Sequence, residues 1–416
     1  MVQYHGRHHV TAMADSPPTT LPRLTPLPYQ VAVVGYLREH EPEVWQWACS
    51  AEARKEHGEA VRAALLKQTY RLDAEAYPEL HRACATACER LGLQVPVTLY
   101  QAGDGAMNAS LYFLPGEAHV VFAGPVLDRL HGPELEALLG HELAHHLLWE
   151  HEGGIYHAAD RILSATADDS RAQASQLQTA RMYRLYTEVF ADRGGAIACG
   201  SLAPAVGALV KTQTGLAAVS AASYLKQADE IFQSAGPAAS AETTHPEVFV
   251  RARALRLWCE GTADAESWLD TALQGPLSLD QADLLGQQRL VGLTRRVLAQ
   301  LLRHRFLRSE AMLGHARRFF PDFQPEETFD ADFAAEVAAA TGTHPYVIAL
   351  LLDVATADRD LDDVPLAAAL EAAQQWGLPE PFEAAALRDL RLPKRQFNKL
   401  KQDTAALLEK ANRQHA

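Results

Sequence analysis

Apolar residues recur every three or four positions along most of this chain, a period typical of helices packed against a core. Such patterns cover residues 29–67 and 76–91, and the second stops before Gly92, a residue suited to end a helix. Two short apolar runs, residues 95–100 and 118–123, instead predict strands. The pattern therefore predicts a mostly helical α+β fold with a small sheet in the N-terminal half.

The helical pattern after the second strand contains His141, Glu142 and His145. Residues four apart lie on one face of a helix, so the two imidazoles can bind one zinc ion. Glu142, beside the first histidine, is placed to act as general base on a metal-bound water. A buried helix with two hydrogen-bonded histidines has the same pattern, and a solvent-facing helix end explains His146 and His151 equally well. We interpret only the first three residues as a candidate zinc site.

A catalytic zinc ion keeps one position for water, so two histidines require a further protein ligand. Glu188 is the best candidate, because it lies in a helical segment with Asp192 one turn later. An acid at that spacing can orient a ligating histidine through the ring nitrogen that does not touch the metal. A solvated acidic helix face gives the same pattern, so the spacing alone leaves both interpretations open.

These segments together resemble the HtpX and CAAX prenyl endopeptidase family of zinc peptidases, whose pattern is HExxH followed by ExxAD on a later helix. Three further matches occur in the family's order: a helix within residues 73–93, Asn108 with the alanine after it, and His245-Pro246 followed by Arg251. The resemblance covers about residues 73–260. It implies a zincin-type peptidase domain with a small sheet beside the HExxH helix.

The resemblance also implies a role for each polar residue of the site. One catalytic zinc ion is bound by three protein ligands, His141, His145 and Glu188. Glu142 then serves as general base and acid, with Asp192 orienting a ligand from behind. By the same resemblance, His245 stabilises the oxyanion of the tetrahedral intermediate and Asn108 holds the substrate backbone. An alternative interpretation of His245 is a residue at the start of a helix, before Pro246, without a catalytic role.

The edge of a small sheet can hold an extended peptide by strand addition. We expect the strand around Val120, Val121 and Phe122 to align the substrate in this way. The leading hypothesis is a soluble zinc endopeptidase that acts on a peptide or protein. An alternative hypothesis is an occluded, zinc-loaded interaction protein that works through its C-terminal helices, and hydrolysis of a non-peptide amide is a third.

After about residue 275 the amino-acid pattern changes and predicts long helices rich in alanine and leucine. An apolar helix that runs into an acidic loop at Asp358, followed by a second helix, resembles the TerB-like helical module of tellurite-resistance proteins from about residue 330. We therefore expect three parts: a flexible extension (1–28), a peptidase domain (29–275) and an all-helical C-terminal domain (276–416). The last offers a surface for a protein partner.

Composition and charge limit the kinds of binding partner and cellular location that we expect. The 416 residues carry a formal charge of −14, with 52 acidic against 38 basic residues, which argues against nucleic acid as the main partner. The longest uncharged run, residues 194–210, is too short for a membrane span and predicts a buried helix beside the site. Five cysteines, an odd number, suit free thiols in a reducing compartment. With no signal-peptide pattern at the N-terminus, these features predict a cytoplasmic protein.

Overall fold

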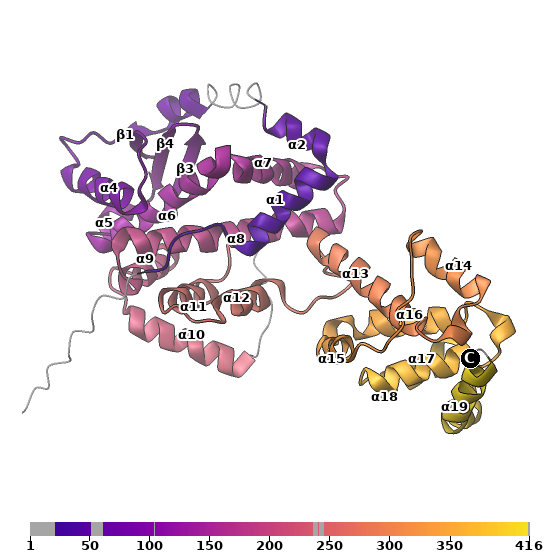
Figure 1. Cartoon of the computed structure of the whole chain (residues 1–416). Coiled ribbons are helices and arrows are strands. Elements are labelled where there is room, and N and C mark those ends of the chain that lie inside the picture. The colour runs from indigo at the N-terminus through magenta and orange to yellow at the C-terminus, as the bar shows by residue number, and fades with distance from the viewer. Residues whose placement is uncertain (1–20, 51–60, 104, 236–239, 241–244, 415–416) are drawn as a thin grey trace, which may run out of the picture.

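The computed structural model describes residues 21–50, 61–103, 105–235, 240 and 245–414 (Figure 1). Most of the predicted flexible extension therefore lies outside the described residues. Its described end, residues 21–27, has no regular structure, and Leu27 is buried against the neighbouring helices. The described chain is predominantly helical with one small mixed sheet, which confirms the predicted fold class.

Helices make up most of the chain up to residue 275. Residues 61–68 are helical, and the labelled elements are α1 (Pro28–His40), α2 (Pro42–Ala48), α4 (Pro78–Leu91), α5 (Val126–Arg129), α6 (Pro133–Glu150), η1 (His151–Gly153), α7 (Ile155–Asp168), α8 (Ala174–Cys199), α9 (Leu202–Thr214), α10 (Ala221–Ala235), α11 (Val248–Cys259) and α12 (Ala265–Gln274). The predicted helix over residues 76–91 corresponds to α4. It ends, as expected, at Gly92, whose φ of 67° lies in the left-handed region.

A second group of helices follows. They are α13 (Leu284–Leu301), η2 (Arg305–Leu307), α14 (Glu310–Phe319), α15 (Ala331–Ala339), η3 (Thr341–Thr343), α16 (His344–Ala355), η4 (Arg359–Leu361), α17 (Val364–Gln375), α18 (Pro379–Asp389) and α19 (Lys394–Gln414). Their buried side chains form one apolar cluster that begins at Val297 and ends at Ala411. In Figure 1 this group lies to one side of the sheet and its helices, joined to them through α13.

The sheet contains β1 (Tyr70–Arg71), β2 (Val97–Gln101), β3 (Asn108–Leu114) and β4 (Glu117–Ala123), in the order β1-β2-β4-β3. Strand β4 pairs in parallel with β2 on one side and antiparallel with β3 on the other. Both of its edges are therefore occupied, and Val120, Val121 and Phe122 are buried. The prediction that these three residues align a substrate is wrong, because among the described residues the edge strands are β1 and the longer β3.

Helices α6 and α8 pack along a seam of small residues. A methyl group added at Gly140 of α6 would collide with Ala198, and one added at Gly194 of α8 would collide with Ala144. Only glycine permits this close approach of the two backbones. The predicted single helix over residues 194–210 is wrong, since the chain turns at Gly200 (φ 72°) between α8 and α9.

Among the described residues, no single helix is long and apolar enough to cross a membrane; one bent pair, residues 331–339 with 341–355, passes by length and composition.

Candidate active site

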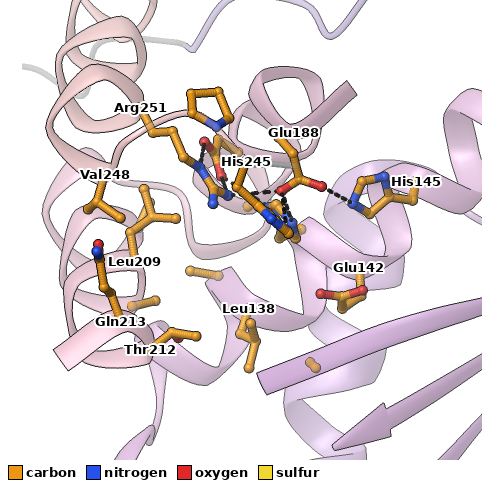
Figure 2. Close-up of a pocket in the computed structure, with 18 of the residues that line it drawn as sticks. Leu138, Glu142, His145, Glu188, Leu209, Thr212, Gln213, His245, Val248 and Arg251 are labelled. Carbon is orange, nitrogen blue, oxygen red and sulfur yellow. Dashed lines mark hydrogen bonds and ion pairs between the residues drawn. The ribbon is translucent and has the colours of Figure 1, made fainter. Parts of the chain in front are cut away.

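Helix α6 directs His141, Glu142 and His145 to one face, where Glu188 approaches from the neighbouring helix α8 (Figure 2). Nε2 of His141 lies 3.5 Å from Oε2 of Glu188, and Nε2 of His145 lies 3.7 Å from Oε1 of the same carboxylate. Figure 2 shows His245 on the opposite side of Glu188, with its Nε2 3.4 Å from Oε2. Glu188 is thus the point on which the site converges.

The three predicted ligands fit one metal ion. One donor atom from each of His141, His145 and Glu188 lies within 4.8 Å of the other two, and the described residues contain no other such group. Oε2 of Glu188 is buried and makes no hydrogen bond to any described residue. Two imidazoles and one carboxylate are the ligand set of catalytic zinc sites that keep a position for water.

The electrostatics of these side chains also favour a bound positive charge. Burial lowers the pKa of His141, but the carboxylates of Asp192 and Glu188 beside its ring outweigh burial and raise the value to about 10. Burial raises the pKa of Glu188, but the neighbouring imidazole of His141 and the guanidinium of Arg251 bring it well below its usual range. The carboxylates therefore stabilise a cation here, and a metal ion can take the place of the proton on His141.

Asp192 and Arg251 form a buried support behind the ligands. Asp192 lies one turn after Glu188 on α8, and its Oδ1 is 3.1 Å from Nδ1 of His141. Arg251 of α11 donates two hydrogen bonds to Asp192, at 2.6 and 2.8 Å, and its Nη2 lies 3.4 Å from Glu188. A histidine held through Nδ1 presents Nε2 in a fixed direction, so the contact with Asp192 fixes the orientation of the His141 ring.

Glu142 lies on the same helix as the histidines and borders the cleft. Burial raises its pKa to about 7, and a hydrogen bond from the backbone N–H of Leu111 in β3 acts in the opposite direction. A carboxyl with a pKa near neutrality can both take and return a proton. The contact with Leu111 also places the open strand edge directly beside this carboxylate.

These residues line one cleft of about 760 Å³. The first residues of β3, including Asn108, form part of its wall, as do His245 and Arg251. The His245 side chain is 57% exposed, in keeping with a group that can meet a ligand. The predicted Asn108 therefore joins the site, while Val120, Val121 and Phe122 do not line the cleft.

Two features of the site are not evident from the pattern of the sequence. Arg251 was noted only as part of a family pattern, and its contact with Asp192 joins segments 59 residues apart. Strand β3 is not predicted from hydrophobicity because Asn108 and Ser110 near its start are polar, although exposed and less exposed positions alternate along it. The Asn-Ala pair of the family pattern was the available signal, since it falls at the first residues of this strand.

The geometry defines a class: a helical protein in which an HExxH helix, an acidic ligand on a second helix and an open strand edge surround one cleft. Comparison with known families agrees, since residues 75–259 match the model of Peptidase family M48, which includes the HtpX and CAAX protease types. The matched part is less than half of the chain, and it contains every residue of the candidate site. No curated protein and no solved structure matches the chain.

Proposed function

We propose that this protein is a zinc-dependent endopeptidase. The observation that carries the proposal is the convergence of His141, His145 and Glu188 beside Glu142 and the open edge of β3. The match to a peptidase family supports it independently. Among the described residues none after Leu255 lines the cleft, so the C-terminal helices form no part of its wall, which supports an enzyme over an alternative in which these helices occlude the site.

An extended peptide would add to the open edge of β3, which supplies backbone hydrogen bonds on the cleft side. A zinc ion held by the three ligands would activate water and polarise the scissile carbonyl. Glu142 accepts a proton in the first step and returns it to the leaving nitrogen in the second. His245, whose Nε2 is 3.4 Å from Glu188, would donate to the oxygen on which negative charge develops.

The proposal is tested with Glu142→Gln in the full-length protein. Because the amide cannot accept the proton, we expect hydrolysis of unfolded casein to fall by about 10²–10⁴-fold. Zinc content should stay at one ion per chain, since Glu142 is not a ligand. Glu136→Gln is the matched control: it alters a glutamate of the same helix that pairs with Arg90 outside the cleft.

Two results would contradict the proposal. If Glu142→Gln cleaves casein at the wild-type rate, Glu142 is not the base. If the wild-type protein binds zinc but shows no chelator-sensitive cleavage, the interaction-protein alternative is favoured instead. The cytoplasmic location, the three-part division of the chain and the TerB-like character of the C-terminal helices stay predictions, because the family match ends at residue 259.

A further inference from the structure

The two ends of the cleft differ in chemistry. On one side of the His141, His145 and Glu188 cluster the wall is largely apolar and uncharged. Leu138, Leu209 and Val248 lie there with the polar side chains of Thr212 and Gln213, on the side away from His145 (Figure 2). The other end carries an aromatic ring and two opposite charges, Trp149, Asp160 and Arg184. A cleft with unlike ends binds an extended ligand in one direction and selects different side chains at each end.

Asp160 of α7 is the unusual member of the polar end. Among the described residues no hydrogen bond or ion pair joins its carboxylate to a partner, and Arg184 acts on it only through its charge at longer range. Burial raises the pKa of Asp160 to about 6. A partly buried carboxylate without a partner is costly for the fold, and a cation placed beside it would relieve that cost.

Trp149 supplies a second feature that suits a cation. It occupies the last turn of α6, and its ring lies 5.6 Å from that of His145 and 5.8 Å from that of His157. His157 precedes Asp160 by three residues on α7, so α7 brings the carboxylate to the same end of the cleft as the indole. The face of an indole attracts ammonium and guanidinium groups.

The open strand gives the direction of the bound peptide. Strand β3 and α6 run the same way along the cleft, because Leu111 contacts Glu142 while Phe113, further along, packs its ring against His146 and Trp149. A peptide paired antiparallel to β3 therefore places its amino-terminal residues at the Trp149 end. Antiparallel pairing is the commoner arrangement of adjacent strands.

We propose that Trp149 and Asp160 form a subsite for a lysine or arginine side chain on the amino-terminal side of the scissile bond. The inference rests on the proposed function and names its specificity. Arg184 on the same wall opposes a bound cation and so moderates the affinity. The net charge of −14 favours the approach of a basic substrate.

The test uses matched peptides that differ at one position on the amino-terminal side, carrying lysine or its uncharged isostere norleucine. Full-length, zinc-loaded protein should show a higher kcat/KM for the lysine peptide. Asp160→Asn should lower the lysine-to-norleucine ratio about tenfold or more, the effect of losing one charged partner in a cleft. Arg184→Gln should raise the ratio, because it removes the opposing charge.

Asp229→Asn is the matched control, since it removes a carboxylate paired with Arg256 outside the cleft and should leave the ratio unchanged. An unchanged ratio in Asp160→Asn overturns the subsite while the peptidase stands. Preference for a glutamate peptide that is lost in Arg184→Gln also overturns it, in favour of an anion subsite. If no peptide is cleaved, the proposed function fails, and the subsite is then tested by binding alone. Fluorescence anisotropy with the Glu142→Gln protein compares the lysine and norleucine peptides. Tighter binding of the lysine peptide that is lost on adding Asp160→Asn supports the subsite, and equal binding of the two peptides overturns it.

Discussion

Glu188 is the residue on which the site depends. Its two oxygens lie within 3.7 Å of His141, His145, His245 and Arg251, so a single carboxylate contacts four basic side chains of the cleft. Glu188 is held in turn by its place one turn before Asp192 on α8. A network of buried charges is stable only when each member keeps a partner, which makes this region sensitive to any single neutralising change.

Asp160 has the opposite character, because no described residue forms an ion pair or hydrogen bond with its carboxylate. Its pKa in the folded protein, about 6, lies above the ordinary value, so the folded state binds its proton more tightly than the unfolded state. The stability contributed by this proton is present below about pH 4 and is lost as the pH rises through about 6. We therefore expect Asp160→Asn to raise the free energy of unfolding at pH 7.5, by about 1–3 kcal/mol.

The measurement is urea denaturation of wild type and Asp160→Asn at pH 4.5 and pH 7.5. The gain in the free energy of unfolding should be clear at pH 7.5 and small at pH 4.5, where the Asp160 carboxyl of the wild type is itself protonated. Asp229→Asn should do the reverse and lose stability at pH 7.5, because Arg256 lowers the pKa of Asp229. An equal gain at both pH values would show that the charge of Asp160 is not the cause.

The residues of the site divide according to how far apart their partners lie in the sequence. His141, Glu142 and His145 could be predicted, because helical geometry alone fixes their relative positions. The contact of Arg251 with Asp192 could not, since it depends on how α11 packs against α8. The unusual environment of Asp160 could not be predicted either, because a single aspartate within a helix is common and the sequence does not show what surrounds it.

At the scale of elements, the seam between α6 and α8 determines whether the ligands meet. Gly194→Ala would place a methyl group against Ala144, one residue before His145. We expect it to lower the free energy of unfolding by about 1–3 kcal/mol, as overpacking does, and to weaken zinc binding by separating Glu188 from the histidines. Chemical denaturation and competition with a chromophoric chelator measure the two effects.

Gly292→Ala is the control for this change. It lies within helix α13, and an added methyl group there meets no neighbouring atom. Alanine favours a helix over glycine, so this variant should be neutral or more stable by up to about 1 kcal/mol, with unchanged zinc affinity. If both variants lose zinc to the same extent, the seam does not position the ligands.

The sheet shows why elements differ in how well they can be predicted. Strand β4 stands out in the sequence because a central strand is buried on both faces and reads as a continuous apolar run. The same burial disqualifies it as a substrate-binding edge. Strand β3 lies at an edge of the sheet, and the polar residues Asn108 and Ser110 on its exposed side interrupt the apolar run that would mark it in the sequence. The substrate-binding role predicted for β4 is therefore better suited to its neighbour β3.

At the scale of the whole molecule, two groups of helices meet at one buried carboxylate. Asp283 precedes α13 and accepts a hydrogen bond from Gly286 N–H at 2.6 Å, which caps that helix. It also accepts one at 2.5 Å from the hydroxyl of Tyr29 in α1, whose ring stacks on Tyr186 of α8. One residue thus joins the N-terminal helix, the helix that carries Glu188 and the first helix of the C-terminal group.

This junction predicts how the protein unfolds. Asp283→Ala removes a helix cap and leaves the hydroxyl of Tyr29 without its buried partner, which together should cost about 2–4 kcal/mol. Because the lost contacts connect the two groups of helices, we expect thermal unfolding to change from one calorimetric transition to two.

Asp330→Ala provides the comparison, since Asp330 caps α15 through Phe333 N–H within the C-terminal group. It should lower the unfolding temperature without splitting the transition. If Asp283→Ala also unfolds in one transition, the two groups are coupled elsewhere along α8 and α13. The backbone N–H of Leu284, which donates to Thr179 at 2.9 Å, is then the next contact to remove, through Thr179→Val.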